Sequence, residues 1–290
     1  MSEKTVCRDV EAYLKAQALI NKLLDWFKGR NSVLVAFSGG VDSTLVTYAA
    51  YKALGDKALA VTADSVTLPP GELEEAVKIA KLIGIRHRII KINELDDPEF
   101  ANNPPDRCYY CKKSLLRTLS RIAETEGLEL LVDGSNADDS RDFRPGLKAL
   151  REFKVRSPLA ELGFTKNDVR LVSRFIGLPT ADKPSMACLA SRIPYGVKIT
   201  HDKLRRVSEA EVYIKRLTGV KQIRVRDHDT IARIEVGRDE RKMFFSEELM
   251  DSIWARLRSL GYVYVTLDLY GYRSGSLNEP IATDGKSTYS

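Results

Sequence analysis

The chain has 290 residues, enough to bury a substantial core in one large domain or in two of ordinary size. Hydrophobic residues make up 43% and charged residues 30%, which argues against a disordered chain or a fibrous repeat. The net charge of +6 suits an anionic ligand such as a nucleotide. Because Lys and Arg form no dense block, charge alone does not predict RNA binding.

Three further features of the sequence point to a cytoplasmic protein. No stretch reaches the roughly 18 apolar residues of a membrane span, and the first residues lack the apolar segment of a signal peptide. The four cysteines Cys7, Cys108, Cys111 and Cys188 are too few and too unevenly spaced for a secreted disulfide scaffold. We therefore expect reduced thiols and no membrane partner.

The first half of the chain alternates predicted helices and strands. In chain order, the elements are a helix at 9–28, a strand at 31–37, a helix at 43–54, a strand at 58–63, a helix at 71–83, a strand at 87–92, a helix at 111–126 and a strand at 128–133. This alternation is typical of βαβ units on a parallel sheet, an α/β fold. The ligand site of such a sheet lies beyond the carboxyl ends of its strands.

The second half begins with a capping box. Thr165 and Asp168 predict the start of a helix that stops near Gly177. Residues 179–200 are rich in Pro, Gly, Ser and Ala and contain Cys188, so we interpret them as a functional connector. The elements that follow are a helix at 202–217, strands at 221–227 and 231–236, a helix at 246–260 and a strand at 262–269. We expect a large domain at 1–195 and a smaller α+β domain at 196–290.

A glycine-rich sequence, SGGVDS, joins the strand at 31–37 to the next helix. Glycines permit tight turns and a close approach of the backbone to phosphates, and the positive end of a helix favours an anion. Hydroxyl groups of Ser38, Ser43 and Thr44 can add hydrogen bonds. The pattern SGGxDS resembles the PP-loop of the ATP-pyrophosphatases, which cleave ATP between the α- and β-phosphates; the GxxxxGK[ST] pattern of a Walker A loop is absent.

The PP-loop resemblance implies a nucleotide site. Pyrophosphate would lie on Ser38, Gly39, Gly40, Val41, Asp42 and Ser43, with Mg²⁺ near Asp42. Adenine or ribose would lie near Ala63 and Asp64, bordered by Asp133, Gly134, Ser135 and Asn136. As an alternative, Asp64 and Asp133 are ordinary solvated loop carboxylates.

Three cysteines form a second group. Cys108 and Cys111 are a C-x-x-C pair at the start of a predicted helix, and Cys188 lies in the connector. The pair alone fits a redox dithiol, half a zinc site or coincidence. Structural zinc prefers four ligands, whereas three thiolates leave a position open, which an iron–sulfur cluster tolerates. Cys7, near the start of the chain, is expected to be incidental.

Five stretches carry a more specific resemblance: ADKPSMACLASRIPYG, NPPDRCYYCKK, DGSNADDSRDFRPG, VRSPLAELGFTKNDVR and RVRDHDTIARIEV. Together they resemble the LarE family of sulfur transferases over nearly the whole chain. The resemblance implies that carboxylates of pyridinium-3,5-biscarboxylic acid mononucleotide become thiocarboxylates for the nickel-pincer cofactor of lactate racemase. It also implies a homo-oligomer.

LarE-type enzymes use sulfur in two ways. Some donate the sulfur of one cysteine and keep dehydroalanine, whereas others hold a 4Fe-4S cluster on three cysteines. By its cysteines the chain resembles the second group, with metal ligands Cys108, Cys111 and Cys188 and with hydrosulfide as a sulfur source. Cys188 and Asp42 are the expected catalytic residues. Sacrificial sulfur transfer from Cys188 is the alternative.

Arginines near Cys188 and in the predicted strands suit the phosphate of a mononucleotide, because guanidinium groups bind phosphate with two hydrogen bonds. The candidates are Arg192, Arg224 and Arg226. As an alternative, Arg224 and Arg226 share one solvated strand face, since alternate residues point the same way. Where the family often has Gly after His228, this chain has Asp229, which leaves that turn in doubt.

Three other functions remain as rivals. A tRNA thiolation enzyme also combines a PP-loop with three cysteines, but the chain lacks extra zinc-knuckle cysteines and a dense basic tract, so we expect no tRNA partner. An ammonia-using synthetase and a non-catalytic nucleotide-binding protein both leave the three cysteines unexplained.

Overall fold

The computed structural model describes residues 3–141, 145–184, 186–273 and 275, and at 3–9 and 140–141 its description is confined to the backbone. The chain forms two compact units. The first comprises the residues up to Ser65, Gly71–Glu94 and Asp106–Met186. The second comprises Val66–Pro70, Leu95–Pro105 and the chain from Ala187 on. The expected domain boundary at 195/196 stays a prediction, and the side chain of Cys7 lies outside the described residues.

The first unit is built on a four-stranded parallel sheet. Its strands are β1 (Val33–Ala36), β2 (Ala58–Ser65), β3 (Arg86–Ile92) and β4 (Leu130–Val132), in the order β3-β2-β1-β4. All three pairings are parallel, so the carboxyl ends of the four strands lie at one edge. The prediction of an α/β fold with a parallel sheet is confirmed.

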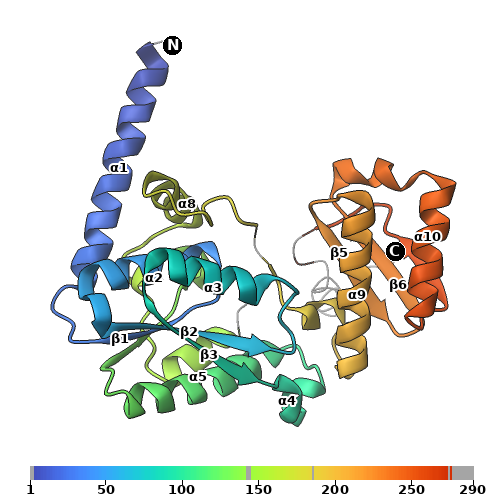
Figure 1. Ribbon diagram of the computed structural model, residues 1–290, viewed down its shortest axis with the longest axis horizontal. Helices are drawn as coiled ribbons and strands as arrows, with labels where there is room; N and C mark the ends of the chain where they lie inside the picture. Colours follow the sequence, from blue (N-terminus) through green and yellow to red (C-terminus); the bar gives the residue numbers. More distant parts are fainter. Residues whose placement is uncertain (1–2, 142–144, 185, 274, 276–290) are drawn as a thin grey trace, which may run out of the picture. The chain divides into compact units, whose positions relative to one another are not determined.

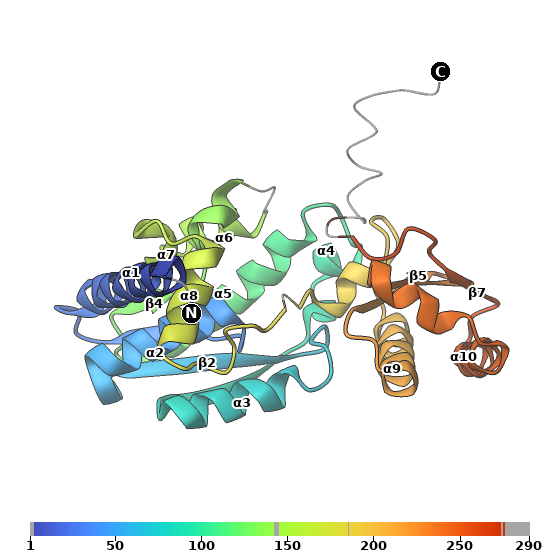
Figure 2. The ribbon, with the colours of Figure 1, turned by 90° about the horizontal axis from the view of Figure 1, so that it is seen from above.

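Helices cover both faces of this sheet. The helices of the first unit are α1 (Glu3–Phe27), α2 (Val41–Leu54), α3 (Glu72–Ile83), α5 (Arg107–Thr125), α6 (Gly146–Glu152), α7 (Pro158–Glu161) and α8 (Lys166–Phe175). Figures 1 and 2 show α2 and α3 on one face and α5 on the other. Single 3₁₀ turns lie at Gly55–Lys57, Glu94–Asp96 and Ala137–Arg141.

Alternation along the strands explains the two layers. Val33 and Val35 of β1 point to one face and join a core with α1, α2, α3 and α8. Leu34 points to the other face and packs with Leu116 and Leu119 of α5. A strand buried on both faces must be apolar throughout, which is the pattern of the central β1.

The second unit holds a small mixed sheet. β5 (Ile223–His228) pairs antiparallel with β6 (Ile231–Val236), and β6 pairs parallel with β7 (Tyr264–Leu267). Its helical elements are α4 (Pro98–Ala101), a 3₁₀ turn at Leu189–Arg192, α9 (His201–Thr218), a 3₁₀ turn at Arg238–Phe244 and α10 (Glu247–Ser259). The core joins α9 and α10 to the apolar face of β5 and β6, which confirms the expected α+β character.

The β5–β6 turn has Asp229 at a position where glycine is usual. Asp229 adopts φ of 58°, the left-handed region that Gly normally occupies. Asp tolerates this conformation better than most residues, and its N–H donates to Asp227 Oδ1 at 3.0 Å. Lys203 Nζ lies 2.6 Å from the Asp229 carboxylate. The tight turn is therefore kept.

Local sequence patterns account for most element boundaries. The predicted capping box is present, with Thr165 accepting from the Asp168 N–H and Asp168 accepting from the Thr165 N–H. α5 begins at Arg107, so both Cys108 and Cys111 lie in its first turns. No helix within the described part of the chain is long and apolar enough to cross a membrane.

Candidate active site

The candidate site begins where the order of the strands reverses. β1 lies between β2 and β4, and the chain leaves β1 toward β2 and β3 before returning to β4 on the other side. Such a switch point opens a crevice between the loops that follow the two neighbouring strands. Here those loops are Ser38–Gly40, after β1, and Gly134–Asn136, after β4. Both contain residues predicted to bind the nucleotide.

The first loop is shaped for close contact with an anion. Gly39 has φ of 71°, and a Cβ there would lie 2.9 Å from Cβ of Ala76 on α3. Gly40 caps α2 without a side-chain hydrogen bond, so the helix leaves its first N–H groups without partners of its own. Ser38 Oγ and Ser43 Oγ lie 3.0 Å apart. The loop and the start of α2 thus present backbone and hydroxyl donors together.

The second loop packs directly on the first. A Cβ on Gly134 would lie 2.7 Å from the backbone N of Ser43 and 2.9 Å from its Cα. No side chain fits into that space, and the contact is with backbone that cannot move aside cheaply. Gly134 therefore lets two segments that are 91 residues apart in the sequence form one surface.

Asp42 is held between two partners from distant segments. Lys166 Nζ, at the first residue of α8, donates to Asp42 Oδ2, and Asn136 Nδ2 donates to Asp42 Oδ1 at 3.0 Å. Asn136 is itself fixed, because its N–H donates to Asp139 Oδ2 at 3.0 Å. The expected metal-binding carboxylate therefore lies in the crevice, beside an ammonium group.

Asp133 is a buried structural carboxylate in this arrangement. It accepts from Ser157 Oγ at 2.6 Å, from Ser135 Oγ at 2.7 Å and from Lys112 Nζ at 3.2 Å. Burial pushes the pKa of Asp133 up, but the Lys112 ammonium and the hydroxyl donors outweigh it and hold the pKa below its ordinary value. The side chain is only 4% exposed, so it is not a solvated loop carboxylate.

A lysine from the connector also reaches the first loop. Lys183 Nζ lies 3.3 Å from the Gly39 carbonyl oxygen, 2.8 Å from Glu72 and 2.9 Å from Glu75. Burial lowers the pKa of Lys183, but the two glutamates on α3 outweigh it and raise that pKa. The ammonium group therefore stays charged beside the loop expected to bind pyrophosphate.

The other predicted nucleotide residues lie at the same edge of the sheet or beneath it. Ala63 and Asp64 are near the carboxyl end of β2, paired with Ile90 and Lys91 of β3. Thr44 is wholly buried, and within the described residues its hydroxyl has no hydrogen-bond partner. The binding roles of these three residues stay predictions.

The cysteine pair lies at the start of α5. Cys108 is exposed and Cys111 is half-buried, and their spacing of three places both on one helix face. Cys111 Sγ lies 4.0 Å from Oε1 of the buried Glu94, which also accepts from Ser65 Oγ at 2.5 Å. Lys112, the next residue, contacts Asp133, so α5 connects the cysteine pair to the nucleotide crevice.

Tyr109 packs α5 against α6. Its hydroxyl donates to Glu152, and the ammonium groups of Lys113 and Lys148 lie 5.4 Å and 4.8 Å from its ring centroid. The ring of Tyr110 is edge-on to it at 5.3 Å. Tyr109 thus already has two cations and a carboxylate as neighbours, which favours packing over stacking on a substrate ring.

Cys188 belongs to the second unit, where it precedes the 3₁₀ turn at Leu189–Arg192. It is half-buried, and the turn behind it is held by Arg192. The Arg192 guanidinium is wholly buried, forms a two-point ion pair with Glu211 and donates to the Cys188 carbonyl oxygen at 2.9 Å. Arg192 therefore contacts the backbone of Cys188, the residue expected to carry sulfur.

Alternate residues of β5 form a buried charged face. Arg226 makes a two-point ion pair with Glu235 of β6, at 3.0 and 2.7 Å. Arg224 is 3% exposed, and within the described residues its Nη2 has no hydrogen-bond partner. Burial and the nearby Arg192 lower the pKa of Arg224. Arg224 and Arg226 share one face of β5, as expected, but this face is buried and not solvated.

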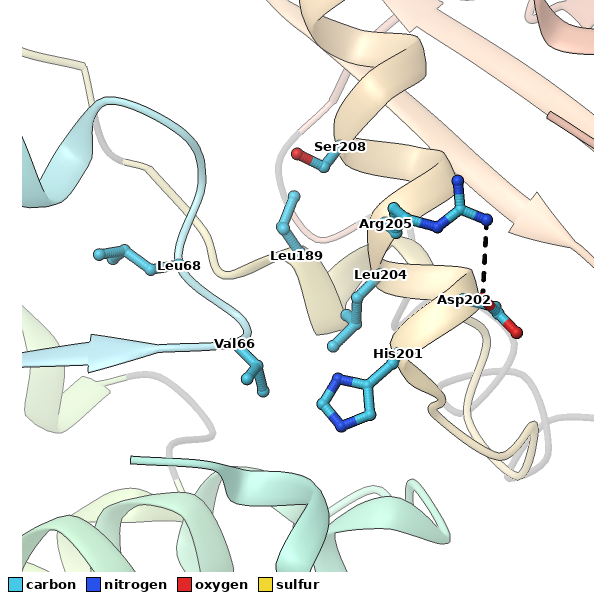
Figure 3. Close-up of a pocket in the computed structure, with 8 residues that line it drawn as sticks. All are labelled: Val66, Leu68, Leu189, His201, Asp202, Leu204, Arg205 and Ser208. Carbon is cyan, nitrogen blue, oxygen red and sulfur yellow. Dashed lines mark ion pairs between the residues drawn. The ribbon is translucent and has the colours of Figure 1, made fainter. Parts of the chain in front are cut away.

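Figure 3 shows a pocket of the second unit that is lined in part by Leu189, the residue after Cys188. Its volume is about 400 Å³, and its lining is aliphatic on one side and polar along α9, formed by Val66, Leu68, Leu189, His201, Asp202, Leu204, Arg205 and Ser208. Arg205 lies 3.6 Å from Asp202 and 3.2 Å from Glu209. Because its guanidinium is already neutralised, the pocket does not favour a phosphate group.

The cysteines suit a sulfur-ligated metal by chemistry. Thiolates are the soft ligands that iron–sulfur clusters use, and the three cysteines are exposed or half-buried. Across the described residues, no three His, Cys, Asp or Glu side chains come close enough to hold a metal ion. The pair belongs to the first unit and Cys188 to the second, so their joint role stays a prediction.

Several residues that fix the candidate side chains within each unit could not be singled out from sequence patterns. Lys112, Lys166 and Lys183 reach the crevice, and Glu211 anchors Arg192. Lys166 and Asp42 are 124 residues apart, so no local spacing reveals their contact. The one available sign was position, because Lys166 follows a recognisable helix cap.

Comparisons with known proteins agree with this geometry. The NAD synthase family model matches residues 15–104, which contain the PP-loop. An uncharacterised protein of Synechocystis sp. is 45% identical over 90% of this chain and 97% of its own length. An uncharacterised protein of Methanocaldococcus jannaschii is 30% identical over 88% of this chain and 96% of its own length.

A third relative carries a functional name. The pyridinium-3,5-bisthiocarboxylic acid mononucleotide synthase of Lactiplantibacillus plantarum is 39% identical over 90% of this chain and 94% of its own length. The likeness thus includes both units, whereas the NAD synthase model matches residues 15–104 alone. The chain therefore belongs to the LarE family, the pyridinium bisthiocarboxylic acid mononucleotide synthases of the PP-loop superfamily, and is an ATP-dependent enzyme of this sulfur-inserting type.

Proposed function

We propose that this enzyme adenylates the carboxylates of pyridinium-3,5-biscarboxylic acid mononucleotide and converts them to thiocarboxylates for a nickel-pincer cofactor. The observation that carries the proposal is the likeness over both units to a synthase of the bisthiocarboxylic product. The crevice of the PP-loop supports it, because a loop that binds pyrophosphate suits adenylation.

Activation by ATP makes chemical sense for this substrate. A carboxylate resists nucleophiles because its charge repels them and oxide is a poor leaving group. In the first step a carboxylate oxygen bonds to the α-phosphorus, the bond to the β-phosphate oxygen breaks, and pyrophosphate leaves. In the second step sulfur from hydrosulfide bonds to the acyl carbon, the carbon–oxygen bond breaks, and AMP leaves with that oxygen.

The residues of the crevice have distinct roles in the first step. We assign pyrophosphate to Ser38–Ser43, where N–H groups at the start of α2 stabilise the charge of the leaving group. We assign Mg²⁺ to Asp42, where the metal would screen the phosphate charge. Lys166, which donates to Asp42, would contact a phosphate if Mg²⁺ bound that carboxylate. Lys183, whose ammonium group contacts the Gly39 carbonyl oxygen, would add positive charge beside the same loop.

For the second step we propose a 4Fe-4S cluster on Cys108, Cys111 and Cys188. Held by these three thiolates, such a cluster would supply an iron without a protein ligand, which would bind hydrosulfide. The paired thiols on one face of α5, and a third thiol on an anchored turn, support this assignment. Sacrificial transfer from Cys188 is the alternative, in which the sulfur leaves Cβ and a proton leaves Cα, so that dehydroalanine remains.

Among the three candidate arginines, Arg224 is the best substrate-phosphate ligand. Arg192 and Arg226 already form two-point ion pairs with Glu211 and Glu235. Arg224 donates to its neighbour's carbonyl oxygen at 2.6 Å and lies 5.3 Å from the ring centroid of Tyr272. A buried guanidinium with an unsatisfied N–H gains most from an incoming phosphate.

The test measures the thiocarboxylate and AMP that are formed by protein reconstituted without oxygen. With substrate, ATP, Mg²⁺ and sulfide, we expect thiocarboxylate formation in step with AMP, and iron that depends on Cys108. A product yield that stops at one sulfur per chain, with dehydroalanine at Cys188, would replace the cluster by the sacrificial route. Salt-dependent binding and thiolation of tRNA would instead favour the tRNA enzyme.

A further inference from the structure

The backbone of the segment that carries Cys188 is fixed by several hydrogen bonds. The Cys188 carbonyl oxygen accepts from the Ser191 N–H at 3.0 Å, from Ser191 Oγ at 2.8 Å and from Arg192 Nη1 at 2.9 Å. Arg192 Nη1 also donates to the Ala187 carbonyl oxygen at 2.6 Å. The backbone on both sides of the cysteine is thereby held, while the thiol side chain stays half-exposed.

The other edge of the same guanidinium is fixed to the sheet. Arg192 Nε and Nη2 each donate to Glu211 at 2.9 Å, and Glu211 also accepts from the Val225 N–H of β5 at 2.9 Å. Arg226 adds a second link, because its Nη1 donates to the Ser191 carbonyl oxygen at 2.7 Å. The segment therefore rests on β5 and α9 through charged side chains and not through apolar packing alone.

This arrangement is costly as a means of stabilising a fold. Arg192 has no exposed surface, and burying a guanidinium removes several kcal/mol of hydration that its partners must restore. Apolar residues of similar volume often stabilise a protein equally well. What a fully bonded polar network adds is a single geometry. The contacts of Arg192 converge on the two carbonyl groups at Ala187 and Cys188.

We propose that Arg192 is a positioning residue for Cys188 and not a ligand of the substrate phosphate. Its planar guanidinium bridges Glu211 and the two carbonyl oxygens, so that the Cys188 thiol is held in one direction for sulfur transfer. The inference rests on the proposed role of Cys188 in the sulfur step, and it holds for a cluster ligand and for a sacrificial donor alike. It assigns no role to Arg192 in adenylation.

The test is the substitution Arg192→Lys, which keeps the charge. A lysine ammonium can reach Glu211 but cannot copy a planar fork that bridges four acceptors. The matched control is Arg206→Lys, at another two-point ion pair of the second unit that contacts Asp227 and not the Cys188 segment. Three rates are measured: pyrophosphate release, thiocarboxylate formation, and alkylation of Cys188 in cluster-free protein, followed by mass spectrometry.

We expect Arg192→Lys to slow thiocarboxylate formation by about tenfold to a hundredfold, because small displacements of a reacting group cost that much. Pyrophosphate release stays within about twofold, and Cys188 is alkylated faster because its segment is less restrained. Arg206→Lys changes none of the three. If Arg192→Lys fails to fold, the double replacement R192M/E211Q removes both charges and is measured in its place.

Two results separate this inference from the proposed function. If Cys188→Ala abolishes thiocarboxylate formation but Arg192→Lys changes neither that rate nor the alkylation of Cys188, Arg192 is not a positioning residue and the proposed function stands. If Arg192→Lys raises the KM for the mononucleotide without changing the alkylation rate, Arg192 is a substrate ligand and the inference is overturned. If Cys188→Ala keeps full thiolation, the proposed role of Cys188 fails, and the inference fails with it.

Discussion

The two units handle charge in opposite ways. In the first unit, the PP-loop presents N–H groups that α2 leaves without partners of its own, and lysines approach it from α8 and from the connector. In the second unit, Arg192 and Arg226 are locked to glutamates by two hydrogen bonds each. One unit offers donors at the edge of a sheet, whereas the other uses its donors to hold its own backbone.

This difference matches two separate tasks. A site that binds ATP and releases pyrophosphate needs donors that a departing anion can leave without rebuilding the protein. A site that presents a thiol needs a rigid backbone around it, and buried ion pairs with complete hydrogen bonding provide that. Substitutions in the PP-loop crevice should therefore affect adenylation, and substitutions around Cys188 should affect sulfur transfer.

The largest expected effect is that of Cys188→Ala. Because Cys188 is proposed to serve only the sulfur step, thiocarboxylate formation should be abolished while substrate-dependent pyrophosphate release continues. Product analysis by mass spectrometry and a pyrophosphate assay check both. Met186→Ala, an exposed position two residues earlier, is the control and should change neither step. Full thiolation by Cys188→Ala would contradict the division of tasks.

Asp42→Asn should slow the adenylation step instead of the sulfur step. The change keeps the shape but removes the charge that is proposed to hold Mg²⁺, so pyrophosphate release should fall by about a hundredfold to a thousandfold. Asp25→Asn, at an exposed carboxylate paired with Lys28, should have no effect. Undiminished pyrophosphate release by Asp42→Asn would remove Asp42 from the nucleotide site.

Gly134→Ala tests whether the two loops must touch. The added Cβ would lie 2.7 Å from the backbone N of Ser43, so we expect a loss of about 1–3 kcal/mol in the free energy of unfolding and weaker ATP binding. Gly146→Ala is the matched control, because its Cβ would meet nothing closer than 3.6 Å. Urea unfolding and the KM for ATP measure the effects. Equal stability of the two variants would show that the loops do not require this contact.

Most of the fold and the position of the PP-loop could be predicted from the sequence, whereas several contacts of the candidate site could not. The strands, most helices and the PP-loop follow from periodicity and from glycines at a strand end, which are local signals. α4, α6 and α7 have only four to seven residues, too few for a periodic pattern. The pairing of Lys166 with Asp42 and of Arg192 with Glu211 depends on tertiary packing, so sequence reasoning assigned Arg192 to phosphate alone.

The smallest expected effect concerns pH. The folded-state pKa of Asp133 lies below its ordinary 3.8, so its carboxylate stabilises the fold fully above that value and loses this contribution as the pH falls through the folded pKa. Asp133→Asn should lower the free energy of unfolding by about 1–3 kcal/mol at neutral pH. In urea unfolding, the gap between wild type and variant should narrow toward acid pH. A gap that widens there would mean that Asp133 is not held ionised by Lys112.

The most direct test of the whole account follows one oxygen atom. The substrate is prepared with a heavy oxygen isotope in its carboxylates, and the AMP formed with ATP, Mg²⁺ and sulfide is analysed by mass spectrometry. If the enzyme adenylates the carboxylate and sulfur then displaces AMP, one labelled oxygen should appear in AMP for each thiocarboxylate made. Thiocarboxylate formed alongside unlabelled AMP would contradict adenylation of the substrate at the PP-loop.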